Sequence, residues 1–406
     1  MSAWLHVVGL GADGVEGLAG PARSLVEHAE LLVGGQRHLS MVRNDAAQKI
    51  VWEFPLDNIV SQIDAARDRR VVVLATGDPM SFGIGSTLTR HFAPEDMSIL
   101  PAPGAFSLAA ARLGWPLHAC TCLTLHGRPL ELLHFHLLPE RRLLILSHDG
   151  STPGRLADIL RSAGFGPSIL HVFENMGAAD ESVRHGIAQT WREDGIADLN
   201  TIGVECLPGP DARYHPPVPG LPDDAFVHDG QMTKRVVRAV TVSALAPMPD
   251  RYLWDLGAGC GSVAIEWLRA AQDVQGQGAR ATAVERDPDR AAMMAQNAAR
   301  LGTPFLDIVT ADISSTLADL DDPDAVFIGG GLADGDLVDT AWARLRPGGH
   351  MVANAVTLEG EQALFRAHNA HGGELSRIAV SHAEPVGRLT GWRSAMPVTQ
   401  WQAVKP

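Results

Sequence analysis

Cysteine is scarce in this sequence: its 406 residues include only Cys120, Cys122, Cys206 and Cys260. Four scattered cysteines cannot form the dense disulfide framework that holds small secreted domains together. Cys120 and Cys122 are separated by one residue, which is neither the spacing of a redox motif nor that of a zinc knuckle. We therefore expect no disulfide framework and no metal site.

Long apolar runs are also missing. No stretch approaches the roughly 18 consecutive apolar residues that a membrane-spanning helix needs. The first six residues contain no basic region followed by an apolar stretch, so no secretory signal is recognisable. These observations predict a cytoplasmic protein that does not contact a membrane.

Positive charge is in deficit: 33 Lys and Arg residues stand against 47 Asp and Glu, which gives a net charge of −14. A general nucleic-acid binder needs a basic footprint to displace counterions, so we expect no nucleic-acid partner. A local cluster of Arg and His can still hold the carboxylates of a small substrate within an acidic protein.

The chain is long enough for two domains, each with its own core. The clearest internal boundary is residues 208–222, which contain six prolines. Proline fixes φ and lacks a backbone donor, so neither a helix nor a central strand can run through this segment. The sequence predicts a first domain over residues 1–212, a proline-rich linker over 213–225 and a second domain over 226–406.

Both domains show alternating strands and helices. Strands are predicted over these short apolar segments: 4–8, 71–75, 143–147, 168–173, 252–256, 281–285, 307–310, 325–328 and 350–355. Helix-like stretches between them include 21–28, which begins with proline, and 152–162. Apolar strands with helical connections predict the α/β fold class, with parallel sheets covered by helices on both faces.

The strongest motif of the second domain joins a strand to a helix. Gly257, Gly259 and Gly261 lie between the two elements. Such glycines let the backbone turn sharply and approach a ligand, while the helix N-terminus offers free N–H groups. The next strand ends in Glu285, whose carboxylate can accept hydrogen bonds from both ribose hydroxyls of a nucleoside. The third strand leads to Asp312, which could meet the exocyclic amine of adenine.

The motif allows three other interpretations. A dinucleotide site would place its third glycine at Ser262 or Val263, which the sequence does not. A plain strand-to-helix turn would not explain a loop and two acidic residues at three strand ends. A nucleic-acid methyltransferase would need a base-flipping motif with an aromatic residue after the fourth strand, where residues 329–331 are all glycine.

The second domain resembles the class I methyltransferase fold, and within it the small decarboxylating precorrin methylases of cobalamin synthesis. The resemblance extends from about residue 230 to the end and rests on residues 232–235, the glycine loop, 327–331 and 345–349. It implies a Rossmann-like sheet that binds S-adenosylmethionine through Thr233, the three loop glycines and Glu285. To these we add Asp312, and Cys260 as a small filler beside the cofactor.

Three glycine-containing loops follow strands of the first domain. They supply these residues: Gly9 and Gly11; Gly77, Asp78, Met80 and Gly83; and Gly104 and Ser107. Open α/β sheets place ligands at this carboxyl end of their strands. Together with residues 125–129, the loops resemble the tetrapyrrole methylase (class III) family over about residues 4–200, and most closely its precorrin members that methylate carbon 5.

This second resemblance implies a two-subdomain fold with S-adenosylmethionine folded in a cleft and held mainly by backbone groups. Cofactor contacts are therefore assigned to these residues of the second and third loops: Gly77, Asp78, Met80, Gly83, Gly104 and Ser107. Gly9 and Gly11 are assigned to the substrate side of the cleft. The family's first loop carries proline where Ala12 stands here, so a less rigid loop is expected.

Candidate substrate ligands are residues that could bind carboxylates or line the acceptor site: His126, Arg128, Lys234, Gly330 and Arg388. Arg235 and Arg393 are further candidates, and His350 is a candidate proton donor. A histidine near a strand end is as often structural as functional, and most surface arginines are simply solvated. These assignments therefore depend on charge type.

Together the two resemblances imply a bifunctional enzyme that acts on a carboxylated tetrapyrrole, with one S-adenosylmethionine site per domain. The first domain would methylate carbon 5, and the second would methylate carbon 15 and remove carbon dioxide from the ring C acetate. Methyl transfer from a sulfonium needs positioning and exclusion of water more than acid–base help, so no catalytic dyad is predicted. A homo-oligomer is expected.

Overall fold

The computed structural model describes residues 3–52, 55–272, 278–333 and 335–406. The chain forms two compact units, Met1–Arg128 with Pro139–Ala212, and Pro129–Leu138 with Arg213–Pro406. The ten residues from Pro129 to Leu138 lie in the second unit, although the predicted boundary places them in the first domain. Within that unit the Arg269 guanidinium lies 5.2 Å from the centre of the Phe135 ring.

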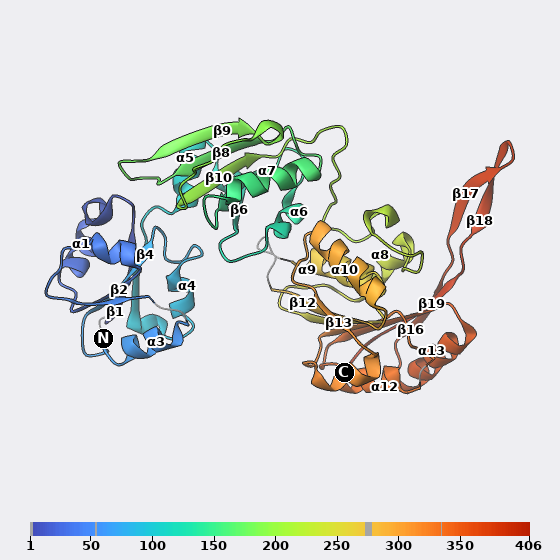
Figure 1. The fold of residues 1–406 in the computed structure, drawn as a ribbon. Helices are drawn as coiled ribbons and strands as arrows, with labels where there is room; N and C mark the ends of the chain where they lie inside the picture. The colour runs from blue at the N-terminus through green and yellow to red at the C-terminus, as the bar shows by residue number, and fades with distance from the viewer. Residues whose placement is uncertain (1–2, 53–54, 273–277, 334) are drawn as a thin grey trace. The chain divides into compact units, whose positions relative to one another are not determined.

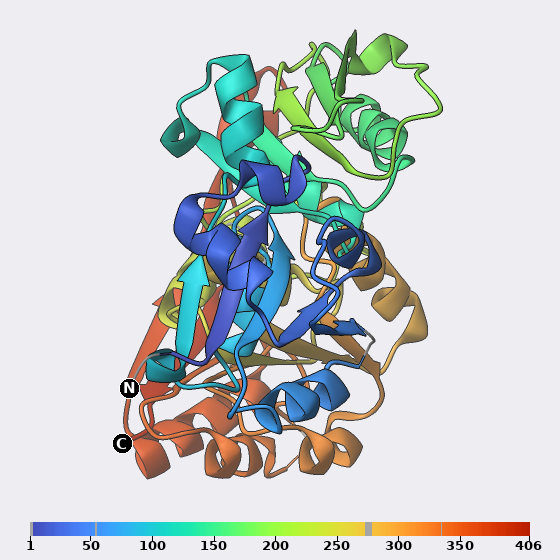
Figure 2. The same ribbon diagram turned by 90° about the vertical axis from the view of Figure 1, so that its left-hand side faces the viewer.

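The first unit begins with a five-stranded sheet in the order β3-β2-β4-β1-β5, in which every pairing is parallel. Its strands, which can be followed side by side in Figure 2, are β1 (Leu5–Leu10), β2 (Leu31–Gly34), β3 (Gln48–Val51), β4 (Val71–Thr76) and β5 (Met97–Leu100). Its helices are α1 (Gly20–Glu27), α2 (Gln36–Ser40), α3 (Asp57–Asp64) and α4 (Ile84–Leu88). Val7 packs in the core beneath α3 and α4, and Val8 in the core beneath α1 and α2. Both faces are therefore covered, as predicted.

The second sheet of this unit is mixed, which corrects the expectation of parallel sheets throughout. Its order is β6-β7-β10-β8-β9, and only the β6–β7 pairing is parallel. The elements are β6 (Cys120–Thr124), β7 (Arg142–Leu146), β8 (Ile169–Glu174), β9 (Ser182–Ile187), β10 (Asn200–Glu205), α5 (Ala105–Leu113) and α7 (Thr152–Ser162). A short turn rather than a crossover helix joins β8 to β9, and such a connection permits only antiparallel pairing.

The second unit is built on a seven-stranded sheet in the order β13-β12-β11-β14-β15-β19-β16. Its strands are β11 (Tyr252–Leu256), β12 (Arg280–Glu285), β13 (Asp307–Thr310), β14 (Ala325–Ile328), β15 (His350–Ala355), β16 (Glu374–Ile378) and β19 (Val398–Val404). The first five strands of that order are parallel, whereas β19 pairs antiparallel with both β15 and β16. The five parallel strands confirm the strands predicted in the second domain.

Helices cover both faces of this sheet (Figure 1). The helices are α6 (Leu133–His136), α8 (Arg235–Ala244), α9 (Ser262–Ala271), α10 (Pro288–Arg300), α11 (Ile313–Thr316), α12 (Leu337–Arg344) and α13 (Leu358–His371). Helices α8, α9 and α10 share one hydrophobic core with the sheet, and α12 and α13 share the other. Within the described part of the chain, none of the helices has the length and apolar character needed to cross a membrane.

A hairpin of β17 (Ser381–Val386) and β18 (Leu389–Ser394) extends away from this sheet (Figure 1). It carries apolar side chains that are largely exposed: Leu389 and Trp392 are each 79% exposed. No strand was predicted here, because Pro385 and two glycines interrupt the alternation of apolar and polar residues that indicates a strand.

A buried ion pair fixes the end of the proline-rich segment to the second unit. Arg238 is fully buried and Glu266 is 1% exposed, and the Arg238 Nε donates to Glu266 at 2.6 Å. The Glu266 carboxylate also accepts hydrogen bonds from the backbone N–H groups of Gly220 and Leu221 at 2.6 and 2.9 Å. Breaking such a buried, fully hydrogen-bonded pair leaves an uncompensated charge, so we infer that these contacts anchor the segment strongly.

Candidate functional site

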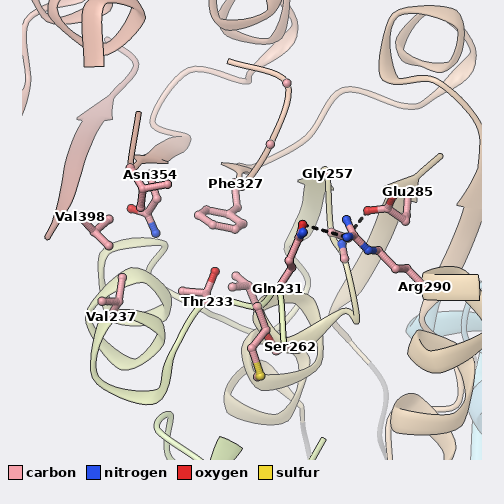
Figure 3. A pocket seen from close by; sticks show the side chains of 18 of the residues that line it. Gln231, Thr233, Val237, Gly257, Ser262, Glu285, Arg290, Phe327, Asn354 and Val398 are labelled. Carbon is pink, nitrogen blue, oxygen red and sulfur yellow. Dashed lines mark hydrogen bonds between the residues drawn. The ribbon is translucent and has the colours of Figure 1, made fainter. Parts of the chain in front are cut away.

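A cavity of about 1410 Å³ opens at the carboxyl ends of the parallel strands in the second unit (Figure 3). Each of the five parallel strands contributes to its wall at or just beyond its end: Gly257 and Gly259 after β11, Glu285 on β12, Asp312 after β13, Gly330 after β14 and Asn354 on β15. This is the edge of an open α/β sheet where ligands bind.

The glycine loop after β11 has the backbone geometry that only glycine adopts readily. Gly257, Gly259 and Gly261 all have positive φ, at 71°, 58° and 78°. A Cβ on Gly257 would lie 2.9 Å from the backbone N and Cα of Gly330. The absence of a side chain therefore lets the loops after β11 and β14 approach each other.

Glu285 is tied to the same loop. Its Oε2 accepts a hydrogen bond from the Gly259 N–H at 2.8 Å, and its Oε1 accepts one from the Asp287 N–H at 3.0 Å. A carboxylate has about four lone-pair sites, so both oxygens can still accept from a ligand. The backbone thus holds Glu285 in the orientation in which it lines the cavity.

Asp255 lies beneath the loop and is fully buried. Its Oδ2 accepts a hydrogen bond from the Ala264 N–H at 3.0 Å, whereas its Oδ1 has no partner among the described residues. Burial raises the pKa of Asp255 to about 7, an effect that the Ala264 N–H partly offsets. The charged form is costly at this position because one oxygen lacks a donor.

This shifted pKa predicts a pH dependence of stability. The folded state keeps the Asp255 proton between pH ~4 and ~7, where the unfolded chain has lost it, so raising the pH favours unfolding. Relative to Asp255→Asn, the wild type is expected to lose up to about 1.4 kcal/mol of unfolding free energy per pH unit in this window. Urea unfolding at several pH values, followed by tryptophan fluorescence, measures this difference. Parallel pH profiles for the two proteins would contradict it.

Thr233 lines the cavity, and the buried side chain of Arg238 holds its backbone. The Arg238 Nη1 donates to the Thr233 carbonyl at 2.6 Å and to the Asp223 carboxylate at 3.0 Å. The Arg238–Glu266 pair therefore positions this wall of the cavity as well as the proline-rich segment.

Cationic side chains at the cavity are Lys234, Arg235, Arg286 and Arg290. Lys234 and Arg235 are exposed. Arg290 is held by Asp229 at 2.8 Å. It also donates to the Gln231 side-chain oxygen at 2.8 Å (Figure 3). The cavity can thus bind an anion at its exposed side while its interior stays mainly apolar.

Several predicted residues lie elsewhere. Cys260 and Gly261 are not among the residues that line the cavity: Cys260 is 2% exposed and packs in the core, and burial raises the pKa of its thiol. Arg388 lies exposed in the hairpin turn, and Arg393 pairs with Glu384 on the hairpin. His350 begins β15, at the opposite end of the strand from the cavity, so its prediction as a proton donor is wrong.

Other lining residues were not predicted. Gln231 and Arg290 contact each other across 59 positions of sequence, and Asn354 and Phe327 occupy strand positions that look like ordinary core positions. The only sequence feature from which Asn354 could be predicted as a cavity residue is its position at the end of an apolar strand. The same feature predicted Glu285 and Asp312.

In the first unit, the loops after β1, β4 and β5 meet as predicted. The Ala102 N–H donates to the Gly77 carbonyl at 3.2 Å, and a Cβ on Gly77 would lie 3.0 Å from the Gly104 Cα. The Asp78 carboxylate accepts from the Met80 N–H at 2.9 Å and so fixes the turn. Backbone groups of these loops are therefore gathered at the carboxyl edge of the first sheet.

Gly9 and Gly11 have close neighbours within the chain. Gly9 is buried, and a Cβ there would lie only 1.9 Å from the Gly77 carbonyl oxygen. This packing gives Gly9 a structural role rather than the predicted position facing the substrate. A Cβ on Gly11 would lie 2.4 Å from the Asp13 carboxylate. Gly83 is crowded as well, since its Cβ would lie 2.6 Å from the Pro79 carbonyl oxygen.

His126 and Arg128 follow β6 and lie close to residues of neighbouring loops. The ring of His126 is 5.3 Å from that of His148, which follows β7 and was not predicted. The Arg128 guanidinium lies 5.9 Å from the centre of the Phe82 ring, which in turn packs edge-on against Phe106. Two histidines and an arginine thus accompany the glycine loops, a composition suited to carboxylate ligands. Ser107, on α5, is exposed.

No group of three or more His, Cys, Asp or Glu side chains in the described ranges is arranged to hold a metal ion. The residues gathered at the two sheet edges are glycine loops, acidic side chains and scattered cations.

Both halves of the chain match known families. Residues 4–190 match the tetrapyrrole (corrin/porphyrin) methylases, and residues 224–405 match the family described as precorrin methyltransferase domain. With its two α/β units and their glycine loops, the protein is a methyltransferase.

Sequence similarity to individual proteins identifies the family within the methyltransferases. A Sinorhizobium precorrin-6Y C(5,15)-methyltransferase (decarboxylating) is 44% identical over 100% of this chain and 97% of its own. The chain belongs to this family. Shorter relatives include a Salmonella typhimurium cobalt-precorrin-7 C(5)-methyltransferase, 30% identical over 44% of this chain and 88% of its own. A probable cobalt-precorrin-6B C(15)-methyltransferase (decarboxylating) of Pyrobaculum calidifontis is 32% identical over 44% of this chain and 93% of its own.

Methyltransferases of this family use S-adenosylmethionine. The residues of the second unit fit such a cofactor. Glu285 retains lone pairs toward the cavity, the loop glycines leave room for close approach, and Asp312 lies on the same wall.

Proposed function

We propose that this chain methylates precorrin-6Y at carbons 5 and 15 and removes carbon dioxide from the ring C acetate, giving precorrin-8 in cobalamin biosynthesis. The main observation that supports this proposal is that two separate sets of glycine loops lie at the carboxyl edges of two different sheets, one in each unit. The similarity to a decarboxylating C(5,15)-methyltransferase over the whole chain supports the same assignment.

The first domain, residues 1–212, is assigned the carbon 5 methylation, and the second, residues 226–406, the carbon 15 methylation and the decarboxylation. Residues 213–225 are the proposed linker. Each domain is proposed to bind one S-adenosylmethionine, in the first through the loops that carry Gly77, Asp78, Met80, Gly83, Gly104 and Ser107. The family matches at residues 4–190 and 224–405 support this division.

In the second domain the cofactor supplies a methyl group on a positively charged sulfur. Glu285 accepts hydrogen bonds from its ribose hydroxyls, and the Gly257 and Gly259 backbone permits its close approach. Phe327 and Val398 form apolar walls that exclude water from the reacting atoms (Figure 3). Lys234 and Arg235, at the exposed side, bind carboxylates of the tetrapyrrole.

Mass spectrometry of the products tests the proposal directly. Purified protein with S-adenosylmethionine and precorrin-6Y is expected to yield a product that has gained two methyl groups and lost one carbon dioxide. A protein that binds S-adenosylhomocysteine but leaves precorrin-6Y unchanged would refute the substrate assignment and leave the methyltransferase class intact.

We further propose that the protein is a homo-oligomer that acts in the cytoplasm. The hairpin supports association, because Val386, Leu389 and Trp392 are 65%, 79% and 79% exposed on a ribbon of only two strands. Such a ribbon is at best marginally stable in water by itself. Light scattering coupled to size-exclusion chromatography is expected to show more than one chain per particle, and Leu389→Ser with Trp392→Ser to shift the mass toward the monomer. A wild-type monomer would contradict the proposal.

A further inference from the structure

Three polar side chains form a cluster on the wall of the second-unit cavity. Asn354 on β15 lies directly opposite Gln400 on β19 in the antiparallel register. Thr241 of α8 packs over both: it is fully buried, and Gln400 is 2% exposed. Asn354 alone of the three lines the cavity.

Hydrogen bonds connect all three side chains. The Asn354 Nδ2 donates to the Thr241 Oγ1 at 2.9 Å, and the Gln400 Nε2 donates to the same oxygen at 3.0 Å and to the Asn354 Oδ1 at 2.9 Å. The reverse orientation of both amides would require the single hydroxyl proton of Thr241 to serve two acceptors. The observed orientation is therefore the one that satisfies every contact.

This arrangement leaves Asn354 with unused hydrogen-bonding capacity. An amide offers two N–H groups and two lone pairs, and one of each is engaged. The second N–H has no partner among the residues that the structure describes. Because the two contacts prevent the amide from rotating, this N–H keeps a fixed direction at the cavity wall.

The surroundings of the cluster are apolar. Figure 3 shows the Asn354 amide between Val398 and Phe327, with Val237 below. The preceding residue on the same face of β15 is Val352, which is fully buried in the core. A polar group in such a place is costly unless its hydrogen bonds are made, so a ligand that accepts the remaining N–H would complete the cluster.

We propose that Asn354 holds the ring C acetate carboxylate that the second domain removes, and that Thr241 and Gln400 act as positioning residues for it. This inference rests on the proposed function. In the step concerned, the bond between the acetate methylene and the carboxylate breaks. Its electron pair passes into the conjugated macrocycle, carbon dioxide departs, and the methylene takes up one proton to become a methyl group.

An uncharged donor suits this step better than a cation. A lysine or arginine would stabilise the charged carboxylate before the reaction and so raise the barrier to losing it. An amide N–H fixes the carboxylate's direction relative to the ring and leaves it poorly solvated among valine and phenylalanine side chains. Among the cations at this cavity, Lys234 and Arg235 are exposed and are left for the carboxylates that stay.

Separate measurement of methyl transfer and carbon dioxide release tests the inference. With the full chain, S-adenosylmethionine and precorrin-6Y, Asn354→Ala is expected to slow carbon dioxide release by roughly 100-fold, the cost of displacing the reacting carboxylate by about 1 Å. Carbon dioxide release is expected to fall much further than methyl transfer, so a methylated product that keeps its carbon dioxide accumulates.

Positioning is tested with two conservative changes. Thr241→Val removes the oxygen that fixes the amide and is expected to slow carbon dioxide release, whereas Thr241→Ser keeps that oxygen and is expected to restore the rate. Gln402→Ala, on the same strand as Gln400 but outside the cavity lining, serves as a control without effect. If both rates fall together in Asn354→Ala and Thr241→Val, or neither changes, the inference is overturned. A wild-type protein that performs neither reaction would instead refute the proposed function beneath it.

Discussion

Glu285→Ala is expected to abolish cofactor binding in the second unit while the first unit still binds. The side chain offers two oxygens to a ribose, and each hydrogen bond to a charged group contributes about 1.5–3 kcal/mol, so affinity should fall by roughly 100-fold or more. The substitution also removes the acceptor of the Gly259 N–H and so loosens the loop. Calorimetric titration with S-adenosylhomocysteine should show two sites per wild-type chain and one per variant chain.

Two further variants distinguish the loss of the ribose contact from a loss of the fold. Glu285→Gln keeps the shape and one carbonyl acceptor, so an intermediate affinity is expected. Glu359→Ala changes an exposed glutamate of the same unit and should leave both sites intact. Retention of two tight sites in Glu285→Ala, or loss of both, would contradict the assignment of one site to each unit.

Gly9→Ala is expected to stop methylation at carbon 5 and to leave the reactions of the second unit unchanged. The new Cβ would lie 1.9 Å from the Gly77 carbonyl oxygen and 2.6 Å from the Ala102 N, both of which are backbone atoms that cannot move independently. The loops after β1, β4 and β5 must then separate. A displacement of about 1 Å can cost roughly 100-fold in rate. Product mass spectrometry should show one methyl gained and one carbon dioxide lost.

Gly20→Ala is the matched control, because a Cβ at this position of α1 has no atom within 4 Å in its surroundings. Alanine favours the helix over glycine, so this variant should be as stable as the wild type or slightly more stable. Normal carbon 5 methylation by Gly9→Ala would show that these loops tolerate separation and that they do not form the site.

Local sequence patterns predicted the parallel part of the second-unit sheet almost to the residue. Strands β11, β13, β14 and β15 have the predicted limits, and β12 begins one residue earlier. Strands β11, β12 and β14 are buried almost throughout, so each appears as a mainly apolar run with glycine or an acidic residue at or directly after its end. The same rule placed Glu285, Asp312 and the glycine loop at the cavity.

Features that depend on distant partners were not predictable in this way. Strand β19 runs antiparallel to both of its neighbours, β15 and β16, and the Asn354–Gln400 contact exists only because β19 pairs with β15. The predictions of Arg388 and His350 depend on charge type, which carries no information about the end of a strand on which a residue lies. Cys260 was placed beside the cofactor by its position in the motif, but its side chain points into the core.

Residues 129–138 have a consequence for how the chain is synthesised. They leave the ribosome with the first unit but pack in the second, where Leu133 and Leu137 are buried. Domains generally fold in order as they emerge, yet this segment cannot be covered until the chain has passed Arg213. During that interval its leucines face water in a nascent chain whose first unit is otherwise complete. A chaperone that recognises short apolar segments would therefore find its binding site here.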